Sequence, residues 1–542
     1  MRLITGVLVV TFFFSFALGD EQHNHALTAE EIGSVHFLTS CSKAVENDFN
    51  RAVALLHSFQ YEQAQDAFEG VAARDPGCAM AQWGVAMSHY HGMWSNGDMN
   101  AGAKALQKAQ EIAQANPQTS KRELAYIDTL AVVYAPDKKD SMSHNQAYEQ
   151  KMAALQAAYP EDSEAAIFYA LALATTAPKT DKTFANQRKC GEILEPLFVK
   201  QPQHPGIAHY IVHCYDNPVL AEKGLPAARL YAQIAPASAH ANHMPSHIFT
   251  RVGAWDESIH SNQRSAELAT QLESASKNGE ARDQRLHAMD YLEYAYLQSG
   301  RVKQAKAVLD EMNSLPAVPG VTQTGGYAHA AIPARYTVEL GQWEKASELE
   351  PVESSVLWAQ AITWAAVGVG GARSQHADRA SQAEHKLAEL RDGLAQQKDT
   401  YWSNQVEVQR REVAAWMAQA SGHNDEALGK LRSAAELEES MDKHAVTPGA
   451  VTPAREMLAE LLLLEKHPTE SLAEYEAVLK TAPNRFNALY GAASAAEAAN
   501  NAVAAHRYFE RLTQVAVGDE RPELVTARKK IALTAQSRAA SN

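Results

Sequence analysis

Histidines recur at helical spacing in two neighbouring stretches of the chain. The segment "HANHMPSHIF" contains His240, His243 and His247, and separations of three and four residues place side chains on one face of a helix. The segment "HPGIAHYIVHCYD" contains His209 and His213, which are also one helical turn apart. Imidazoles from two helices packed about 8–10 Å apart can meet at a metal ion, with nitrogen–metal bonds of about 2.0–2.1 Å. The two segments therefore predict a transition-metal site, for Zn, Cu or Fe, between facing helices.

A third segment repeats the spacing of the first. His287, Asp290 and Tyr294 lie thirteen, ten and six residues before Gly300, and the three histidines of the first segment lie at the same distances before Gly253. We therefore expect His287 to join the metal ligands. Asp290 is a candidate oxygen ligand, or a partner that fixes a histidine tautomer. Tyr294 is a candidate ligand-binding side chain in the same groove, and a place in the core between repeats is its alternative interpretation.

Arg335 lies six residues before Gly341, at the position that Tyr294 holds in the preceding unit. A guanidinium there is a candidate clamp for a carboxylate or phosphate group of a bound ligand. An ion pair between Arg335 and Asp290 is the alternative interpretation. His91, in the segment "SHYHGMW", is expected at the end of another helix and is a further candidate for the groove.

Proline disfavours a helical conformation in the residue before it, so Pro245 predicts either a kink or a helix start near Met244. If the helix starts there, His240 and His243 lie on the loop that enters it, and only His247 is held by helix geometry. The predicted site is then centred on His247 and the two histidines of "HYIVH", with His243 as the next candidate.

Other interpretations of the histidines are open. A stripe of buried imidazoles is costly unless it is hydrogen-bonded or bound to metal, and a hydrogen-bonded stripe makes a pH-sensitive polar groove. The segment "HYIVH" has the histidine spacing of the zincin proteases but lacks the glutamate of their HExxH motif. No P-loop, dinucleotide-binding or nucleophile-elbow motif occurs, so no nucleotide cofactor is expected and no catalytic residue is assigned.

The glycines that serve as reference points belong to an internal repeat. Near the C-terminus the sequence aligns with itself at a shift of 34 residues, which places Ser471 on Ala505 and Tyr475 on Phe509. Glycine supplies a turn between helices, and a small residue in the following helix lets it pack closely. Four glycines are each followed five residues later by a small residue, and the pairs are Gly253 with Ser258, Gly300 with Ala305, Gly341 with Ala346 and Gly422 with Ala427.

This pattern, in "GAWDES" from Gly253, in "GQWEKA" from Gly341 and in the proline-terminated units at both ends, resembles the tetratricopeptide repeat (TPR). The resemblance implies an all-α fold: a right-handed superhelical solenoid of helix-turn-helix repeats whose concave groove binds a peptide, a protein or a small-molecule ligand. The segments "HMPSHIFTRVGAWDESI", "HPGIAHYIVHCYDNP" and "AAIPARYTVELGQW" are also similar to a group of exported bacterial TPR proteins with no assigned activity.

Composition agrees with a folded helical protein that is exported. Hydrophobic residues make up 46% and charged residues 21% of the 542 residues, and the formal net charge of -15 excludes nucleic acid as an expected partner. The first residues, "MRLITGVLVVTFFFSFALGD", have the pattern of a secretory signal peptide cleaved near Gly19. After cleavage no apolar stretch approaches the ~20 residues that span a bilayer, so we expect a periplasmic or secreted protein.

Four cysteines suit a compartment that permits disulfides. Proximity in the sequence favours the pairs Cys41 with Cys78 and Cys190 with Cys214. Four cysteines allow two other pairings, and free thiols or metal ligation are further alternatives.

Clusters of Pro, Gly and Thr predict interruptions in the repeats, among them "TTAPKTDKTF" near residue 175 and "DKHAVTPGAVTP" near residue 442. We therefore expect a signal peptide at 1–19, N-terminal repeats at 20–175, central repeats with the histidines at 185–440 and C-terminal repeats at 450–540. Three functions fit this organisation. In the first, the groove binds a ligand together with a transition metal, either as a binding protein or as a metal carrier. In the second, the solenoid is a scaffold for protein-protein interaction without metal. In the third, it is a metalloenzyme with its site in the same groove.

Overall fold

The computed structural model describes residues 27–93, 97–137, 140–277, 279–316, 323–351 and 356–541. The predicted signal peptide at 1–19 lies outside these residues. The regular structure of the described ranges is helical, with no strand, which confirms the all-α prediction. None of the helices described there is long and apolar enough to cross a membrane.

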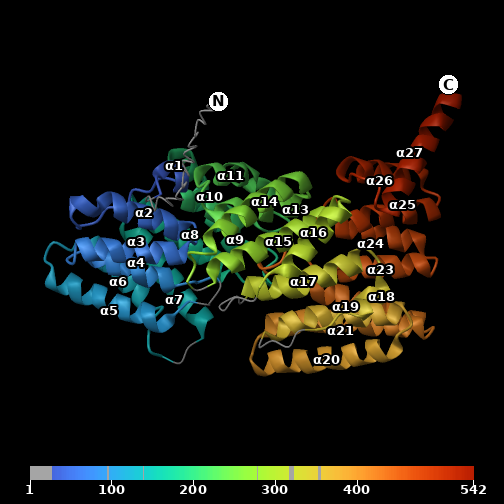
Figure 1. The fold of residues 1–542 in the computed structure, drawn as a ribbon, viewed down its shortest axis with the longest axis horizontal. Helices are drawn as coiled ribbons and strands as arrows, with labels where there is room; N and C mark the ends of the chain where they lie inside the picture. Colours follow the sequence, from blue (N-terminus) through green and yellow to red (C-terminus); the bar gives the residue numbers. More distant parts are fainter. Residues whose placement is uncertain are drawn as a thin grey trace, which may run out of the picture.

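The helices follow one another along a solenoid, because each packs mainly on its neighbours in the sequence (Figure 1). The N-terminal helices, blue to green in Figure 1, begin at one end. The largest apolar cluster runs from Ile32 to Phe249 and so includes helices on both sides of the interruption predicted near residue 175. The helices of this part are α1 (Ala29–Ile32), α2 (Glu46–His57), α3 (Tyr61–Arg74), α4 (Ala79–His89), α5 (Met99–Ala115), α6 (Lys121–Ala131), α7 (Ser141–Ala158), α8 (Ser163–Thr176) and α9 (Ala185–Lys200), with a short 3-10 helix at Lys43–Val45 before α2.

The central helices carry the histidine segments and lie in the middle of Figure 1, in green and yellow. Pro205 is the first residue of α10, as expected for proline in the first helical turn. The central helices are α10 (Pro205–Tyr215), α11 (Ala221–Ile234), α12 (Ala239–His243), α13 (Pro245–Val252), α14 (Trp255–Leu272), α15 (Glu280–Gln298), α16 (Val302–Ser314), α17 (Gln323–Glu339) and α18 (Trp343–Ser347).

The C-terminal helices, orange to red in Figure 1, fold back against the central ones. Trp255 Nε1 donates a hydrogen bond to the carbonyl oxygen of Asn484 at 3.0 Å, and Asn484 Nδ2 donates to the carbonyl oxygen of Gly253 at 3.0 Å. The buried Arg485 pairs with Glu339 of α17. The C-terminal helices are α19 (Leu357–Arg373), α20 (Ala377–Gln396), α21 (Thr400–Ala420), α22 (Asn424–Glu439), α23 (Ala454–Leu464), α24 (Pro468–Thr481), α25 (Phe486–Ala498), α26 (Ala502–Val515) and α27 (Pro522–Ser541).

The repeat residues occupy the positions that the sequence predicts. All four turn glycines have φ angles between 62° and 78°, in the left-handed region that glycine adopts without strain. The small residues five positions later are fully buried, so the second helix of each pair packs closely. An aromatic ring also packs on a glycine sixteen residues later in two of the repeats. The ring of Phe68 covers Gly84 and the ring of Tyr475 covers Gly491, and neither glycine has room for a Cβ atom. The chain is thus an all-α solenoid of TPR-like helix pairs.

Pro245 kinks a helix and does not start one after a loop. Met244, which joins α12 to α13, has helical dihedral angles of φ -54° and ψ -36°. Proline is tolerated there because the N–H that it lacks lies in the first turn of α13. Of the two alternatives for this segment the kink is correct, so His240 and His243 lie on helix α12 and not on an entering loop.

Both disulfides expected from proximity in the sequence are present. Cys41 pairs with Cys78, and Cys190 pairs with Cys214. The second bond ties α9 to α10, the helix that carries His209 and His213.

Candidate metal centre

Six buried histidines meet in the middle of the solenoid, and each is at most 8% exposed. They form two adjacent groups, and within each group one ring nitrogen per histidine lies within 4.8 Å of the others. We call them the first and second histidine groups. The first group is His209 and His213 of α10 with His240 of α12, and the second group is His243 of α12, His247 of α13 and His287 of α15.

In the first group the nitrogens converge on His209. Its Nε2 lies 3.0 Å from Nε2 of His213 and 3.0 Å from Nε2 of His240. Its other nitrogen, Nδ1, donates to the backbone carbonyl oxygen of His57 at 2.6 Å. A carbonyl only accepts hydrogen bonds, so the proton of neutral His209 is on Nδ1 and its Nε2 presents a lone pair to the group.

In the second group two lone pairs face each other. His243 Nδ1 lies 2.7 Å from Oδ1 of Asn262, whose amide nitrogen donates to the carbonyl oxygen of Ser258. His247 Nδ1 lies 2.9 Å from Oδ2 of Asp216. Both Nδ1 atoms therefore carry protons. The Nε2 atoms of His243 and His247 are 3.0 Å apart, and neither neutral ring has a proton to place between them.

Burial keeps these rings neutral. It lowers the pKa of His243 well below the usual range, and the nearby His247 lowers it further. Burial likewise lowers the pKa of His209 and of His287 well below the usual range. In the second group the facing Nε2 lone pairs of His243 and His247 have no donor between them, and a transition-metal ion would supply the missing positive centre. The donor set therefore fits a metal.

The carboxylate behind His247 is itself fixed by two cations. Arg251 Nε donates to Asp216 Oδ1 at 2.8 Å, and Lys443 Nζ donates to Asp216 Oδ2 at 3.1 Å. Burial acts to raise the pKa of Asp216, but Lys443 and Arg251 outweigh it and hold the pKa well below its usual range. Asp216 is therefore an ionised acceptor for the Nδ1–H of His247, the arrangement that orients metal-binding histidines in proteins.

A second buried network lies behind the first histidine group. Glu164 accepts hydrogen bonds from Nε2 of His57 at 2.9 Å and from Nε2 of His204 at 2.9 Å. Burial raises the pKa of Glu164, but the two histidines outweigh it and hold the pKa below its usual range. His57 Nδ1 also contacts the hydroxyl of Tyr210 at 2.9 Å. These hydrogen bonds hold His57 in place. We therefore interpret the network as one that positions the His57 carbonyl, which accepts the hydrogen bond from His209.

Four residues predicted for the groove, Asp290, Tyr294, Arg335 and His91, lie outside both histidine groups. Arg335 is fully buried, and its Nη1 pairs with Asp290 Oδ1 at 2.6 Å and with Glu293 Oε2 at 3.0 Å. It therefore faces no open groove, and the ion pair is the interpretation that describes its geometry. Asp290 belongs to neither histidine group. Tyr294 packs against this ion pair, with its ring centroid 5.4 Å from the guanidinium carbon of Arg335, and it also lines a cavity next to the C-terminal helices. His91 stacks on Tyr61 with ring centroids 3.9 Å apart, outside both groups.

Sequence patterns brought five of the six histidines to one site but left out important neighbours. His240 was assigned to the loop alternative, and the structure places it on a helix in the first group. The supporting residues His57 and Glu164 come from helices distant in the sequence, and Asn262 comes from α14, the helix after α13. Asp216 does have a local sequence signal, since it directly follows the helix segment "HYIVHCY" that supplies His209 and His213.

The sequence matches no protein-family model, and no curated protein matches it. Similar solved structures include yeast Tom70 and the P58(IPK) TPR domain. Yeast Tom70 is 13% identical, covers 76% of this chain and 96% of its own, and superposes with a TM-score of 0.30. The P58(IPK) TPR domain is 14% identical, covers 69% of this chain and 99% of its own, and superposes with a TM-score of 0.22.

Proposed function

We propose that this protein binds two transition-metal ions, one at each histidine group. The observation that carries the proposal is the contact between Nε2 of His243 and Nε2 of His247 at 3.0 Å, with both Nδ1 atoms already engaged by acceptors. Without a cation this contact is a repulsion between two lone pairs. A metal ion bound to both nitrogens turns it into ligation.

All six proposed ligands are neutral imidazoles, a donor set that suits Zn, Cu or Fe. Three histidines at one ion leave a coordination position for water or another small ligand, as in metal sites that act on a substrate. Neither group includes a carboxylate among the described residues, so we propose binding and assign no reaction. The two disulfides support a place for the protein in an oxidising compartment, periplasmic or secreted.

A TPR-like scaffold for a protein or peptide is the second candidate function. The observation that favours it is the stack of helix pairs itself, since such solenoids offer extended surfaces to partners. The two functions are compatible, because the histidine groups are buried and do not occupy the helix surfaces that a partner would contact.

Metal content of protein purified without a histidine tag tests the main proposal. We expect two equivalents of transition metal by mass spectrometry, and loss of one of them in His213→Ala and in His287→Ala. His385→Ala, which removes an exposed histidine, is the matched control and should change nothing. A content below about a tenth of an equivalent, even after reloading with Zn, Cu or Fe salts, overturns the proposal.

A further inference from the structure

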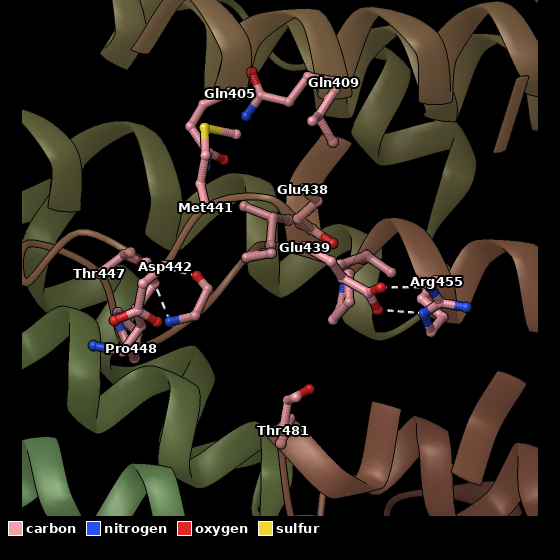
Figure 2. Close-up of a pocket in the computed structure, with 18 of the residues that line it drawn as sticks. Gln405, Gln409, Glu438, Glu439, Met441, Asp442, Thr447, Pro448, Arg455 and Thr481 are labelled. Carbon is pink, nitrogen blue, oxygen red and sulfur yellow. Dashed lines mark hydrogen bonds and ion pairs between the residues drawn. The ribbon is translucent and has the colours of Figure 1, made fainter. Parts of the chain in front are cut away.

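A cavity of about 580 Å³ lies between the central and C-terminal helices. We call it the central cavity. Helices α17, α19, α21 and α24 contribute to its lining, and so does the segment from Met441 to Pro453 that joins α22 to α23. Its volume is typical of sites for small molecules, which occupy about 300–1,000 Å³. Figure 2 shows Gln405 and Gln409 on one side of the cavity and Thr481 on the other.

One face of α21 lines this cavity with one aromatic and three polar side chains. Trp402, Gln405, Gln409 and Glu412 follow one another at separations of three and four residues, so they share one helical face. Gln409 Oε1 is buried and has no hydrogen-bond partner. Glu412 is 5% exposed, and no described residue donates to its carboxyl or pairs with it. Two residues of the cavity lining thus carry acceptors without donors.

A second carboxyl of the cavity lining, that of Glu438 on α22, is near enough to act on Glu412 through its charge. Glu438 Oε2 accepts a hydrogen bond from the backbone N–H of Ala454 at 2.9 Å, and Glu438 also lines the cavity. Burial raises the pKa of Glu412 well above its usual range, and the charge of Glu438 raises it further. Burial raises the pKa of Glu438 to about 7. The two carboxyls therefore repel each other when ionised, and a cation between them would remove the repulsion.

The cations of the lining form no ion pair with Glu412, although the charge of Arg455 acts on Glu438. Arg455 pairs with Glu439 and Glu474, as its dashed lines to Glu439 in Figure 2 show. Arg251 and Lys443 pair with Asp216. Of the remaining two, Lys182 lies in the field of Asp442 and Glu439, and Lys480 is exposed on α24. None of these pairs with Glu412.

The other end of the α21 face is aromatic. Trp402 stacks on Trp358 with ring centroids 4.4 Å apart and an interplanar angle of 13°, and both line the cavity with Tyr327 and Tyr401. Ten residues separate Trp402 from Glu412, which corresponds to about 15 Å along a helix. The cavity therefore has an apolar end and an acidic end.

We propose that the central cavity binds an elongated primary amine of low molecular weight. Its ammonium group lies between Glu412 and Glu438, and its apolar body lies against Trp358 and Trp402. An ammonium has three N–H donors, and the two carboxyls and Gln409 Oε1 provide three acceptors. The volume favours a small molecule over a peptide. This inference is independent of the metal proposal, because the histidine groups contribute no lining residue.

Calorimetric titration with phenylhexylamine, and with phenylhexanol as the uncharged counterpart, tests the proposal on the full-length protein. We expect the amine to bind at least about tenfold more tightly than the alcohol, because only its charge is stabilised by the carboxyls. The Glu412→Gln variant should lose about tenfold or more in affinity for the amine and little for the alcohol. Glu436→Gln, which alters an exposed carboxylate of the same helix as Glu438, is the matched control.

Circular dichroism and metal content should be unchanged in both variants, so a failure here does not bear on the histidine groups. Equal affinity for the amine and the alcohol in the wild-type protein overturns the proposal. So does an unchanged amine affinity in a folded Glu412→Gln variant. Binding of a lysine-containing peptide, with no binding of phenylhexylamine, would also overturn it in favour of a peptide site.

Discussion

His247 and Asp216 are joined by a hydrogen bond of 2.9 Å that fixes which nitrogen of His247 is available to a metal. The carboxylate accepts the proton of Nδ1, and Nε2 is left to face His243. Asp216 is in turn fixed by Arg251 and Lys443, which also line the central cavity. The second histidine group thus depends on a charge network that the histidines themselves do not contain.

Replacing Asp216 by Asn should weaken metal binding at the second group by about 10- to 100-fold, the usual effect of removing a carboxylate that orients a histidine ligand. Competition with a chromophoric chelator measures this affinity. Asp442→Asn is the matched control, because Asp442 pairs with the same Arg251 but does not contact His247. If both variants weaken binding equally, the hydrogen bond to His247 is not the cause.

Metal removal should lower the thermal stability of the protein. A ligand that binds only the folded state stabilises it by about 2.7 kcal/mol when its free concentration is 100 times its dissociation constant. Differential scanning calorimetry before and after treatment with a chelator measures the change. We expect the midpoint to fall on chelation and to recover when metal is added back, and the variants His213→Ala and His287→Ala should each lose part of this response. An unchanged midpoint would argue against ligation in the folded state.

The sequence predicted the local part of this site and missed the tertiary part. Helical periodicity places His209 beside His213 on α10 and His243 beside His247 across the kink between α12 and α13, because each pair is four residues apart. Positions counted back from the turn glycines extend the histidine stripe to the next repeat, where they predict His287. These inferences need only the geometry of one helix and one repeat.

Arg335 shows why the rest was not predictable. Its position in the repeat suggests a ligand clamp, but Glu293, one turn after Asp290 on α15, adds a second buried carboxyl group that engages the guanidinium. The central cavity was even less predictable from the sequence. It exists because the C-terminal helices fold back onto the central ones, and contacts such as Trp255 with Asn484 join residues more than two hundred positions apart.

The disulfide between Cys190 and Cys214 should support both stability and the first histidine group. It closes a separation of 24 residues and holds α10 next to α9. Replacing both cysteines by Ser should cost about 2–4 kcal/mol in the free energy of unfolding and weaken metal binding at His209 and His213. The same change at Cys41 and Cys78 should cost a similar amount but leave metal binding intact, since that bond lies away from the histidines. Urea unfolding and chelator competition distinguish the two effects.

Glu293 should make stability depend on pH. Burial raises its pKa to about 8, whereas a carboxyl in the unfolded chain titrates near its ordinary value of about 4.3. The folded state therefore holds a proton that the unfolded state releases over this range. Its contribution to stability is fully present below the unfolded pKa and is lost as the pH rises through the folded pKa.

Glu293→Gln should remove this contribution. Urea unfolding at pH 5.5, 7 and 8.5 should show that the wild-type protein loses stability relative to the variant as the pH rises, by about 1.4 kcal/mol for each unit by which the pKa is raised. The exposed Glu436→Gln variant should follow the wild-type curve. Parallel curves for wild type and Glu293→Gln would mean that Glu293 is ionised next to Arg335.

The TPR-like packing can be tested at two glycines within the same helix pair. A methyl group on Gly84 would overlap the ring of Phe68, so Gly84→Ala should destabilise the protein by about 1–3 kcal/mol through overpacking. Gly70 lies in α3 with no atom within 4 Å of the position of its Cβ, so Gly70→Ala should stabilise it by about 0.5–1 kcal/mol through helix propensity. Thermal unfolding measures both changes. Effects of the same sign at the two positions would contradict the close approach of Phe68 to Gly84 on which the first helix pair depends.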